Sequence, residues 1–267
     1  MAEEVKKSRP APDPNSAKYK LGQIAAKAYS DAMEAKKRGE MVGWCASNFP
    51  VEIPETLGLY VCYPENQAAG IAARGGGERM CNEAEGDGYS NDICAYARIS
   101  LAYAKLKSAP EQDMPMPDFV LCCNNICNCM IKWYENLAVS LNIPYIIIDV
   151  PYNHTMPVSQ HAKEYIVDQF KYCIKQLEDV CGKPFDYDKF VKVQEQTQRS
   201  VAAWDRAMGM CAHTPSPMNG FDMFNYMGLI VCARSKHDTE VTFNRLYEEE
   251  TKFSTFNPTA DWLKAPF

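Results

Sequence analysis

The sequence lacks any long hydrophobic run. Its most apolar stretch, Tyr145 to Val150, is far shorter than the roughly 20 residues that a transmembrane helix requires. The N-terminal segment MAEEVKKSRPAPDPNSAKYK also lacks the apolar core of a secretory signal peptide. We therefore expect a cytoplasmic protein without membrane contact, in which the cysteines stay reduced and are either free or bound to metal.

An excess of positive charge is also missing. The chain has 28 Lys and Arg residues against 34 Asp and Glu residues, which gives a formal net charge of −6. This balance argues against nucleic acid or an anionic membrane surface as a partner, and it favours a small or carrier-bound substrate. At 267 residues, of which 46% are hydrophobic, the chain is long enough for one large or two medium-sized domains.

Common catalytic signatures are absent as well. Gly75 to Gly77 lie inside a helical stretch and do not follow a strand, which disfavours a dinucleotide-binding fingerprint or a P-loop. The sequence has no Gly-x-Ser-x-Gly motif of a hydrolase nucleophile. The four histidines are scattered, and only His154, after a predicted strand, is placed for chemistry. A histidine in such a loop is more often structural.

Short β-prone runs alternate with helical segments in the first half of the chain. This alternation is typical of a parallel sheet in an α/β layer, so the predicted fold is Rossmann-like, of the flavodoxin-like kind. A helix at 22–38 is expected to end at Gly39. The predicted strands are 41–46, 57–62, 118–123 and 144–150, and the predicted helices between them are 66–84, 92–107 and 128–141.

The second half changes character. Two amphipathic stretches, 162–180 and 187–208, predict a helical connector. The run Leu229 to Cys232 predicts a strand and 238–252 a helix, which together would start a second α/β domain. The predicted organisation is a mobile arm at 1–18, an N-terminal α/β domain at 19–158, the connector at 159–212, and an incomplete second α/β domain at 213–267.

Cysteine is abundant, with 12 residues, and its densest group is the segment LCCNNICNC (121–129) after the third predicted strand. Ligands of open α/β sheets bind in the loops at the carboxyl ends of the strands, and a helix N-terminus there stabilises a thiolate. Soft thiolates favour zinc, copper or an iron–sulfur cluster. The spacing by itself leaves metal ligation and plain burial in the core equally open.

Two further residues have a similar placement. Asn91 or Asp92 is a natural N-cap, which would put Cys94 in the first turn of the next helix. Glu65 lies just past the carboxyl end of the second predicted strand, where it is the best candidate for a general acid or base. A buried cysteine and a solvated surface glutamate are the plainer interpretations of these two residues.

From about Val42 to Glu250 the sequence resembles the 2-hydroxyacyl-CoA dehydratase family, which also contains benzoyl-CoA reductase-type subunits. Among its branches the resemblance is strongest to the alpha-type subunits that act on hydroxyglutaryl-, phenyllactyl-, isocaproyl- or lactoyl-CoA. The matching segments are CASNFPVE (45–52), VCYPENQAAG (61–70), EGDGYSNDICAYARI (85–99), PDFVLCCNNICNCMIKWYE (117–135), IPYIIIDVPYNHT (143–155) and PSPMNGFDMFNYMG (215–228).

The resemblance implies a heterodimer of two homologous subunits, each with a [4Fe-4S] cluster held by three cysteines, and a separate ATP-hydrolysing iron–sulfur activator. The activator supplies one electron, which reduces the thioester carbonyl of an (R)-2-hydroxyacyl-CoA to a ketyl radical. Loss of hydroxide and of a β-proton then returns the electron and yields the (E)-2-enoyl-CoA. Because the β-proton is otherwise too weakly acidic for a side-chain base, the cofactor supplies the difficult step.

Carried over residue by residue, the resemblance implies that Cys94 and Cys127 are cluster ligands, with Cys123 and Cys129 as alternatives. In the family the third cysteine ligand lies in a carboxyl-terminal part of a longer subunit, so we expect this chain to be truncated at its C-terminus. The context of Cys232, the only late cysteine in a predicted strand end, does not match that ligand.

Two other positions are carried over. Ser47 matches a hydroxyl near the open iron site, and Glu65 matches a proton-transfer residue. The resemblance therefore implies an oxygen-sensitive hydro-lyase subunit of amino-acid fermentation. A benzoyl-CoA reductase-type acyl-CoA reductase subunit and a non-catalytic truncated remnant are the alternatives.

Overall fold

The computed structural model of the protein describes residues 13–256. The predicted mobile arm therefore lies outside the described residues over positions 1–12, and its last residues, Ala17 and Lys18, belong to the first helix. In chain order the elements are α1 (Ala17–Lys37), β1 (Val42–Cys45), α2 (Glu52–Thr56), β2 (Tyr60–Cys62), α3 (Pro64–Ala73), α4 (Gly77–Gly86), α5 (Ala95–Leu106), β3 (Phe119–Cys123), α6 (Asn128–Leu141), β4 (Tyr145–Ile148), α7 (Gln160–Cys181), α8 (Tyr187–Gly209), a 3-10 turn (Met210–Ala212), α9 (Gly220–Ala233) and α10 (His237–Phe256).

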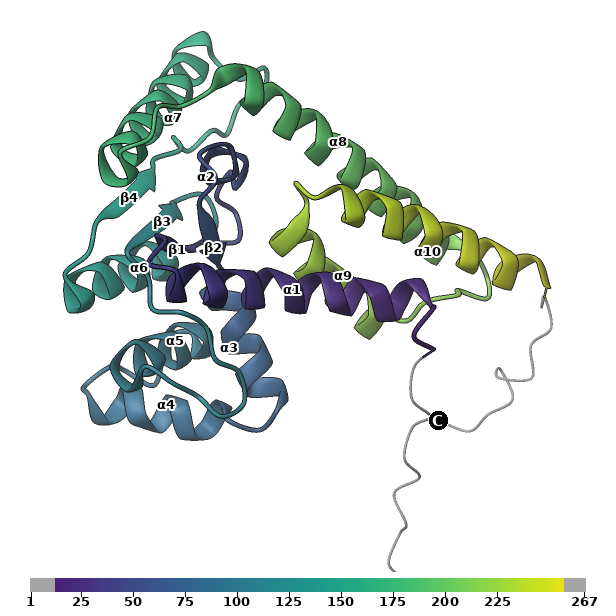
Figure 1. Ribbon diagram of the computed structural model, residues 1–267, viewed down its shortest axis with the longest axis horizontal. Helices are drawn as coiled ribbons and strands as arrows, with labels where there is room; N and C mark the ends of the chain where they lie inside the picture. The colour runs from purple at the N-terminus through teal and green to yellow at the C-terminus, as the bar shows by residue number, and fades with distance from the viewer. Residues whose placement is uncertain (1–12, 257–267) are drawn as a thin grey trace, which may run out of the picture.

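The four strands form one parallel sheet in the order β2-β1-β3-β4 (Figure 1). This order begins the flavodoxin-like arrangement, so the predicted α/β fold is confirmed. Every residue of the central strands β1 and β3 is buried, as expected for a sheet with helices on both faces. β1 pairs with β2 on one side and with β3 on the other, so the strand order reverses at β1. In open α/β sheets ligands bind outside the carboxyl ends of the strands at such a reversal.

Local chemistry explains where the helices begin and end. Ser16 and Ser159 cap α1 and α7 by accepting hydrogen bonds from backbone N–H groups of the first turn. Pro64 starts α3 because its missing N–H is not needed there. The predicted helix at 66–84 is in fact two helices, α3 and α4, because Gly75 adopts a left-handed backbone (φ 89°) that ends the first.

The expected strand at Leu229 to Cys232 is wrong, because these residues lie within helix α9. Asn219 caps this helix by accepting the Asp222 N–H at 3.0 Å. Tyr226, Leu229 and Ile230 are buried at helical spacing, so the apolar run is one face of a helix and not a buried strand. The described part of residues 213–267 contains no strand, and the division of the chain into domains stays a prediction.

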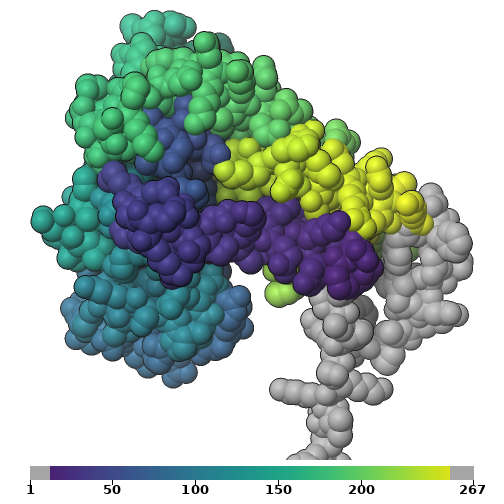
Figure 2. Space-filling view, in the orientation of Figure 1, coloured from purple at the N-terminus to yellow at the C-terminus, as the bar shows by residue number. Residues whose placement is uncertain are grey.

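Helices α1, α8, α9 and α10 share a second hydrophobic core beside the sheet. Figure 1 shows α8 and α10 running alongside each other, and Figure 2 shows α1 in purple extending from the sheet region toward the yellow α10. A bulky residue, Phe243, is completely buried at this junction. The core contains Ala17, Leu21, Ala203, Ala207, Met208, Met210, Met218, Tyr226, Leu229, Ile230, Phe243 and Leu246.

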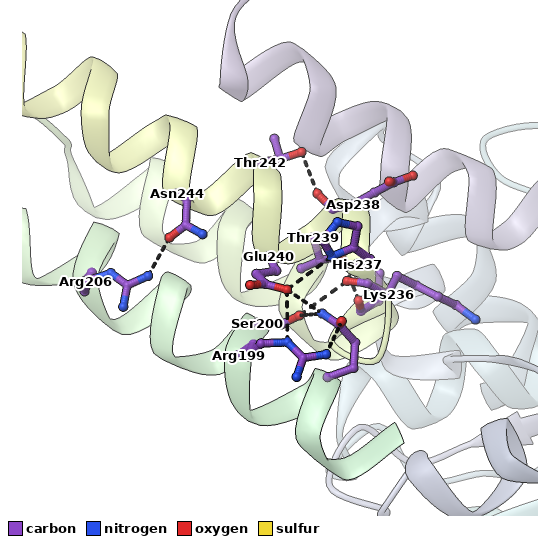
Figure 3. A network of polar contacts seen from close by, with 12 residues as sticks. Arg199, Ser200, Arg206, Lys236, His237, Asp238, Thr239, Glu240, Thr242 and Asn244 are labelled. Atoms are coloured by element: carbon purple, nitrogen blue, oxygen red, sulfur yellow. Dashed lines mark hydrogen bonds and ion pairs between the residues drawn. The ribbon is translucent and has the colours of Figure 1, made fainter. Parts of the chain in front are cut away.

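Polar contacts fix the start of α10 on α8 (Figure 3). Glu240 accepts hydrogen bonds from Gln196 at 3.0 Å and from Arg199 at 3.4 Å, and it also contacts the His237 ring at 3.2 Å. The Ser200 hydroxyl donates to the Lys236 carbonyl at 3.3 Å. The turn between α9 and α10 is therefore held by the side of α8.

Within residues 13–256, no helix combines the length with the hydropathy that a membrane span requires.

Candidate functional site

A carboxylate network lies at the carboxyl edge of the sheet, where the loops after β1 and β2 meet helix α6. Glu65 stands in the first turn of α3, directly after β2. Its Oε1 accepts a hydrogen bond from the Ser47 backbone N–H at 3.0 Å, and its Oε2 accepts one from the Tyr134 hydroxyl at 2.8 Å. The structure thus brings together Ser47 and Glu65, the two predicted catalytic residues, and adds Tyr134.

The environment of Glu65 alters its acidity. Burial raises the pKa of this carboxyl above its usual range, and the hydrogen bonds from Ser47 and Tyr134 lower it by a smaller amount. A carboxyl with a raised pKa exchanges protons with a substrate more readily near neutral pH than an ordinary glutamate does. The geometry is therefore suited to a proton-transfer group that is fixed in orientation.

The two predicted ligand cysteines occupy equivalent positions on neighbouring helices. Cys127 is the N-cap residue of α6 and Cys94 is the N-cap residue of α5, and both thiols are exposed. The expectation that Asn91 or Asp92 caps α5 is wrong, because the helix begins only at Ala95. Each sulfur therefore stands at the positive end of a helix, a position that suits an anionic ligand or cluster.

A third cysteine, Cys129, interacts with both of these residues. It lies half-buried in the first turn of α6, and burial raises its pKa. A backbone hydrogen bond from Cys94 lowers that pKa, while the negative charges that Cys94 and Cys127 carry when ionised raise it. We call Cys94, Cys127 and Cys129, the three cysteines at the N-termini of α5 and α6, the thiol patch. Within the described chain, no three or more His, Cys, Asp or Glu side chains are grouped so that they could hold a metal ion.

The other sequence-predicted thiols are placed differently. Cys123 and its neighbour Cys122 belong to the buried strand β3, where burial raises the pKa of each thiol to about 12. Cys232 lies on α9, where its sulfur accepts a hydrogen bond from Asn66 Nδ2 at 2.7 Å. His154 is exposed in the segment after β4. None of these residues joins the thiol patch.

Asparagines join the strand-end loops. Asn48, after β1, donates to Asn125 Oδ1, which stands two residues before Cys127. Asn124 donates to Asp149 and accepts the Val150 N–H at 2.7 Å, which connects the loops after β3 and β4. The loop that presents Ser47 and the loop that leads to Cys127 are therefore joined along one edge of the sheet, at the point where the strand order reverses.

Sequence reasoning missed Tyr134 and the asparagines. Tyr134 lies inside an amphipathic helix and is completely buried, so by pattern it is a core residue like Leu137. Only its hydroxyl distinguishes it, because a buried tyrosine hydroxyl usually has a hydrogen-bond partner. The paired asparagines of LCCNNICNC were a usable signal, since Asn side chains commonly bond to nearby loop backbone.

Comparison with known proteins identifies the family to which the chain belongs. Residues 46–260 match the family model described as 2-hydroxyglutaryl-CoA dehydratase, D-component. The chain belongs to this dehydratase family. The matched residues include Ser47, Glu65, Cys94, Cys127 and Tyr134, so the whole candidate site lies inside the family region.

Individual relatives agree with this assignment. The (R)-phenyllactyl-CoA dehydratase alpha subunit of Clostridium sporogenes is 53% identical over 239 residues, which are 88% of this chain and 59% of that protein. The lactoyl-CoA dehydratase subunit alpha of Anaerotignum propionicum is 49% identical over 247 residues, 87% of this chain and 58% of that protein. One of the benzoyl-CoA reductase subunits of Thauera aromatica is 27% identical over 230 residues, 80% of this chain and 51% of that protein. The chain thus spans about three fifths of the length of the dehydratase subunits.

Proposed function

We propose that this chain is part of an (R)-2-hydroxyacyl-CoA dehydratase, a hydro-lyase that forms the (E)-2-enoyl-CoA. The observation that carries the proposal is the connected edge on which the hydrogen-bonded Glu65 carboxyl and the exposed thiols of Cys94 and Cys127 meet. The 53% identity to a phenyllactyl-CoA dehydratase subunit, against 27% to a benzoyl-CoA reductase subunit, favours dehydration over reduction.

The cofactor in this proposal is a [4Fe-4S] cluster bound through Cys94 and Cys127. Exposed thiols at two helix N-termini fit such a group, because iron–sulfur clusters take thiolate ligands and helix dipoles stabilise negative charge. Cys129 is the remaining ligand candidate in the thiol patch, whereas the buried Cys123 is a poor one. When bound, the cluster supplies one-electron reduction of the substrate's thioester after activation.

The chain's own side chains handle protons and orientation. Glu65 holds or releases a proton at its carboxyl oxygens, which the Ser47 N–H and the Tyr134 hydroxyl orient. Tyr134 and the Ser47 N–H fix the carboxyl plane, which lowers the entropy cost of the proton transfer. We assign the Ser47 hydroxyl to orienting the substrate's oxygen atoms. Elimination needs this proton transfer because the leaving hydroxyl and the β-proton depart as water.

The proposal includes two protein partners. A homologous second subunit would complete the enzyme, and an ATP-hydrolysing iron–sulfur activator would supply the electron. The substrate is an acyl-CoA thioester, in agreement with the acidic composition that disfavours nucleic acid. We place the assembled enzyme in an anaerobic cytoplasm.

The test is anaerobic co-expression of this chain with a second dehydratase subunit, followed by iron and sulfide analysis. We expect about four irons and four sulfides per subunit, and activator-dependent formation of enoyl-CoA without net electron consumption. Net consumption of electrons would instead indicate the reductase alternative. Folded protein without iron would indicate a non-catalytic remnant and would contradict the proposal.

A further inference from the structure

The Arg234 side chain links helix α9 of the second hydrophobic core to the sheet. It lies at the end of α9, and its guanidinium reaches the segment after β1. Nε donates to Glu52 Oε1 at 2.8 Å, and one terminal nitrogen donates to the Phe49 carbonyl at 2.9 Å and to Glu52 Oε2 at 3.4 Å. One side chain therefore holds both a buried carboxylate and a loop carbonyl.

The segment that Arg234 holds is the one that presents Ser47 to Glu65. The Ala46 N–H donates to the Leu121 carbonyl at 2.8 Å, and the Phe49 N–H donates to the Ala46 carbonyl at 3.0 Å. These bonds close a tight turn with Ser47 inside it. Because Phe49 is the far end of this turn, fixing its carbonyl also fixes the direction of the Ser47 N–H.

The turn between α9 and α10, from which the Arg234 side chain extends, is held by hydrogen bonds. The Thr239 hydroxyl donates to the Ala233 carbonyl at 2.7 Å, and the Lys236 N–H donates to the same carbonyl at 3.0 Å. The contacts of Ser200 and Glu240 between α8 and α10 hold this turn from the other side (Figure 3). Arg234 is therefore anchored at both ends.

Burial makes the contact specific. The side chain of Glu52 is 6% exposed and that of Arg234 is 17% exposed, so both charges are largely removed from water. A buried ion pair gains little stability over a well-packed apolar pair, because desolvation offsets the Coulomb attraction. Its clearest contribution is a fixed geometry, since a guanidinium presents its donors in a rigid plane.

We propose that Arg234 is a positioning residue for the proton-transfer site: through Phe49 and Glu52 it fixes the turn that aims the Ser47 N–H at Glu65. The inference rests on the proposed function for its catalytic consequence. Its structural part stands on the contacts alone. The proton-transfer site is therefore ordered only when α9 packs correctly against the sheet.

The experiment compares Arg234→Gln, Arg234→Lys and the paired substitution Glu52→Leu with Arg234→Met. The paired variant keeps the site apolar and folded while it removes the donor to Phe49. Lys236→Gln is the matched control, because Lys236 makes an ion pair with Glu55 from the same turn but is half exposed and does not reach the Ser47 turn. Amide hydrogen exchange of residues 46–51 is measured first, on the isolated chain.

We expect the Ser47 and Phe49 amides to exchange about tenfold faster or more in Arg234→Gln and in the paired variant, the size of effect that the loss of a charge-assisted hydrogen bond produces. Arg234→Lys restores part of the protection, and Lys236→Gln leaves it unchanged. Unchanged exchange in a folded paired variant would overturn the inference.

The second measurement uses the assembled, iron-loaded enzyme. We expect the kcat per bound cluster to fall about tenfold or more, with KM changed by less than about twofold, and with partial rescue by Arg234→Lys. A purely structural defect would reduce the amount of folded enzyme and leave kcat per cluster intact, which would overturn the positioning role. If the unmodified enzyme shows no dehydratase activity, the proposed function fails, while the exchange result still decides the structural part.

Discussion

Tyr134 donates a hydrogen bond from its hydroxyl to Glu65 Oε2 at 2.8 Å. Tyr134 lies about two turns along the helix that Cys127 caps, so a single element, α6, carries both a thiol of the patch and the group that orients the carboxylate. The relative placement of the proposed cluster site and the proton-transfer residue is therefore set by one rigid helix. The loop conformations alone do not determine it.

The first prediction concerns this bond. Tyr134→Phe removes the hydroxyl that donates to Oε2 and lowers the pKa of Glu65, so this pKa should rise further above its usual range. We expect turnover to fall about tenfold, the usual effect of a misplaced acid–base group, and the acid limb of its pH profile to move to higher pH. We also expect the free energy of unfolding to fall by about 1–3 kcal/mol, because a buried carboxylate oxygen is left unpaired.

Kinetics across pH and chemical denaturation test this prediction. Tyr172→Phe on α7 serves as the control, because Tyr172 is 60% exposed and lies outside the site. Equal pH profiles for Tyr134→Phe and the unmodified enzyme would mean that the bond does not tune Glu65.

The second prediction distinguishes the cysteines. We expect Cys94→Ser and Cys127→Ser to lose most bound iron in the anaerobically assembled enzyme, because each removes an exposed thiolate at a helix N-terminus. Cys123→Ser should retain iron, since the Cys123 thiol is buried in β3. Iron analysis and the visible absorbance of the cluster provide the measurement. Cys173→Ser, on helix α7, controls for unspecific loss of a buried thiol.

An inverted result would be informative. Loss of iron in Cys123→Ser with retention in Cys127→Ser would make Cys123, and not Cys127, the cluster ligand in this loop. Loss of iron in Cys129→Ser would add this residue, which lies in the first turn of α6, as a ligand.

The sheet was predictable because its strands are short apolar runs bounded by helices with ordinary start signals. The four predicted strands and the helix at 128–141 correspond to β1 to β4 and α6. The run Leu229 to Cys232 misled the prediction because four apolar residues in a row fit a buried strand and a buried helix equally well. Only the flanking Tyr226 and the cap at Asn219 reveal the helical period.

The site was predictable in part. Topology places residues at strand ends along one edge, so Glu65 and the cysteine-rich loop that contains Cys127 followed from their positions in the sequence, whereas Ser47 came from the family resemblance alone. Cys94 lies in a segment between two helices, and its approach to α6 depends on how α5 packs against that helix. The contacts of Tyr134 and Arg234 join segments far apart in the chain, and no local pattern marks such pairs.

The third prediction tests the sheet register. Gly43 of β1 pairs with Phe119 of β3, and a Cβ added at Gly43 would overlap the Phe119 ring. We expect Gly43→Ala to lower the free energy of unfolding by about 1–3 kcal/mol through overpacking. Gly22→Ala on α1, where the added Cβ meets open space, should raise it by about 0.5–1 kcal/mol. Chemical denaturation of both variants tests this, and equal stability of Gly43→Ala and the unmodified chain would contradict the register.

The last prediction concerns pH. Burial, together with the nearby carboxylates of Asp222 and Glu249, raises the pKa of Glu250 from 4.5 to about 7, while Lys18 lowers it slightly. Folding therefore favours the protonated carboxyl, whose stabilising contribution is complete below about pH 4.5 and is lost as the pH rises through 7. Glu250→Gln should be more stable than the unmodified chain at pH 8 by about 1–2 kcal/mol after solvent screening, and about equally stable at pH 4.

Thermal and chemical unfolding at both pH values provide the measurement, with Glu248→Gln, an exposed neighbour on α10, as the control. A pH-independent difference between Glu250→Gln and the unmodified chain would show that the carboxyl has the same pKa in the folded and the unfolded state, and it would contradict the prediction.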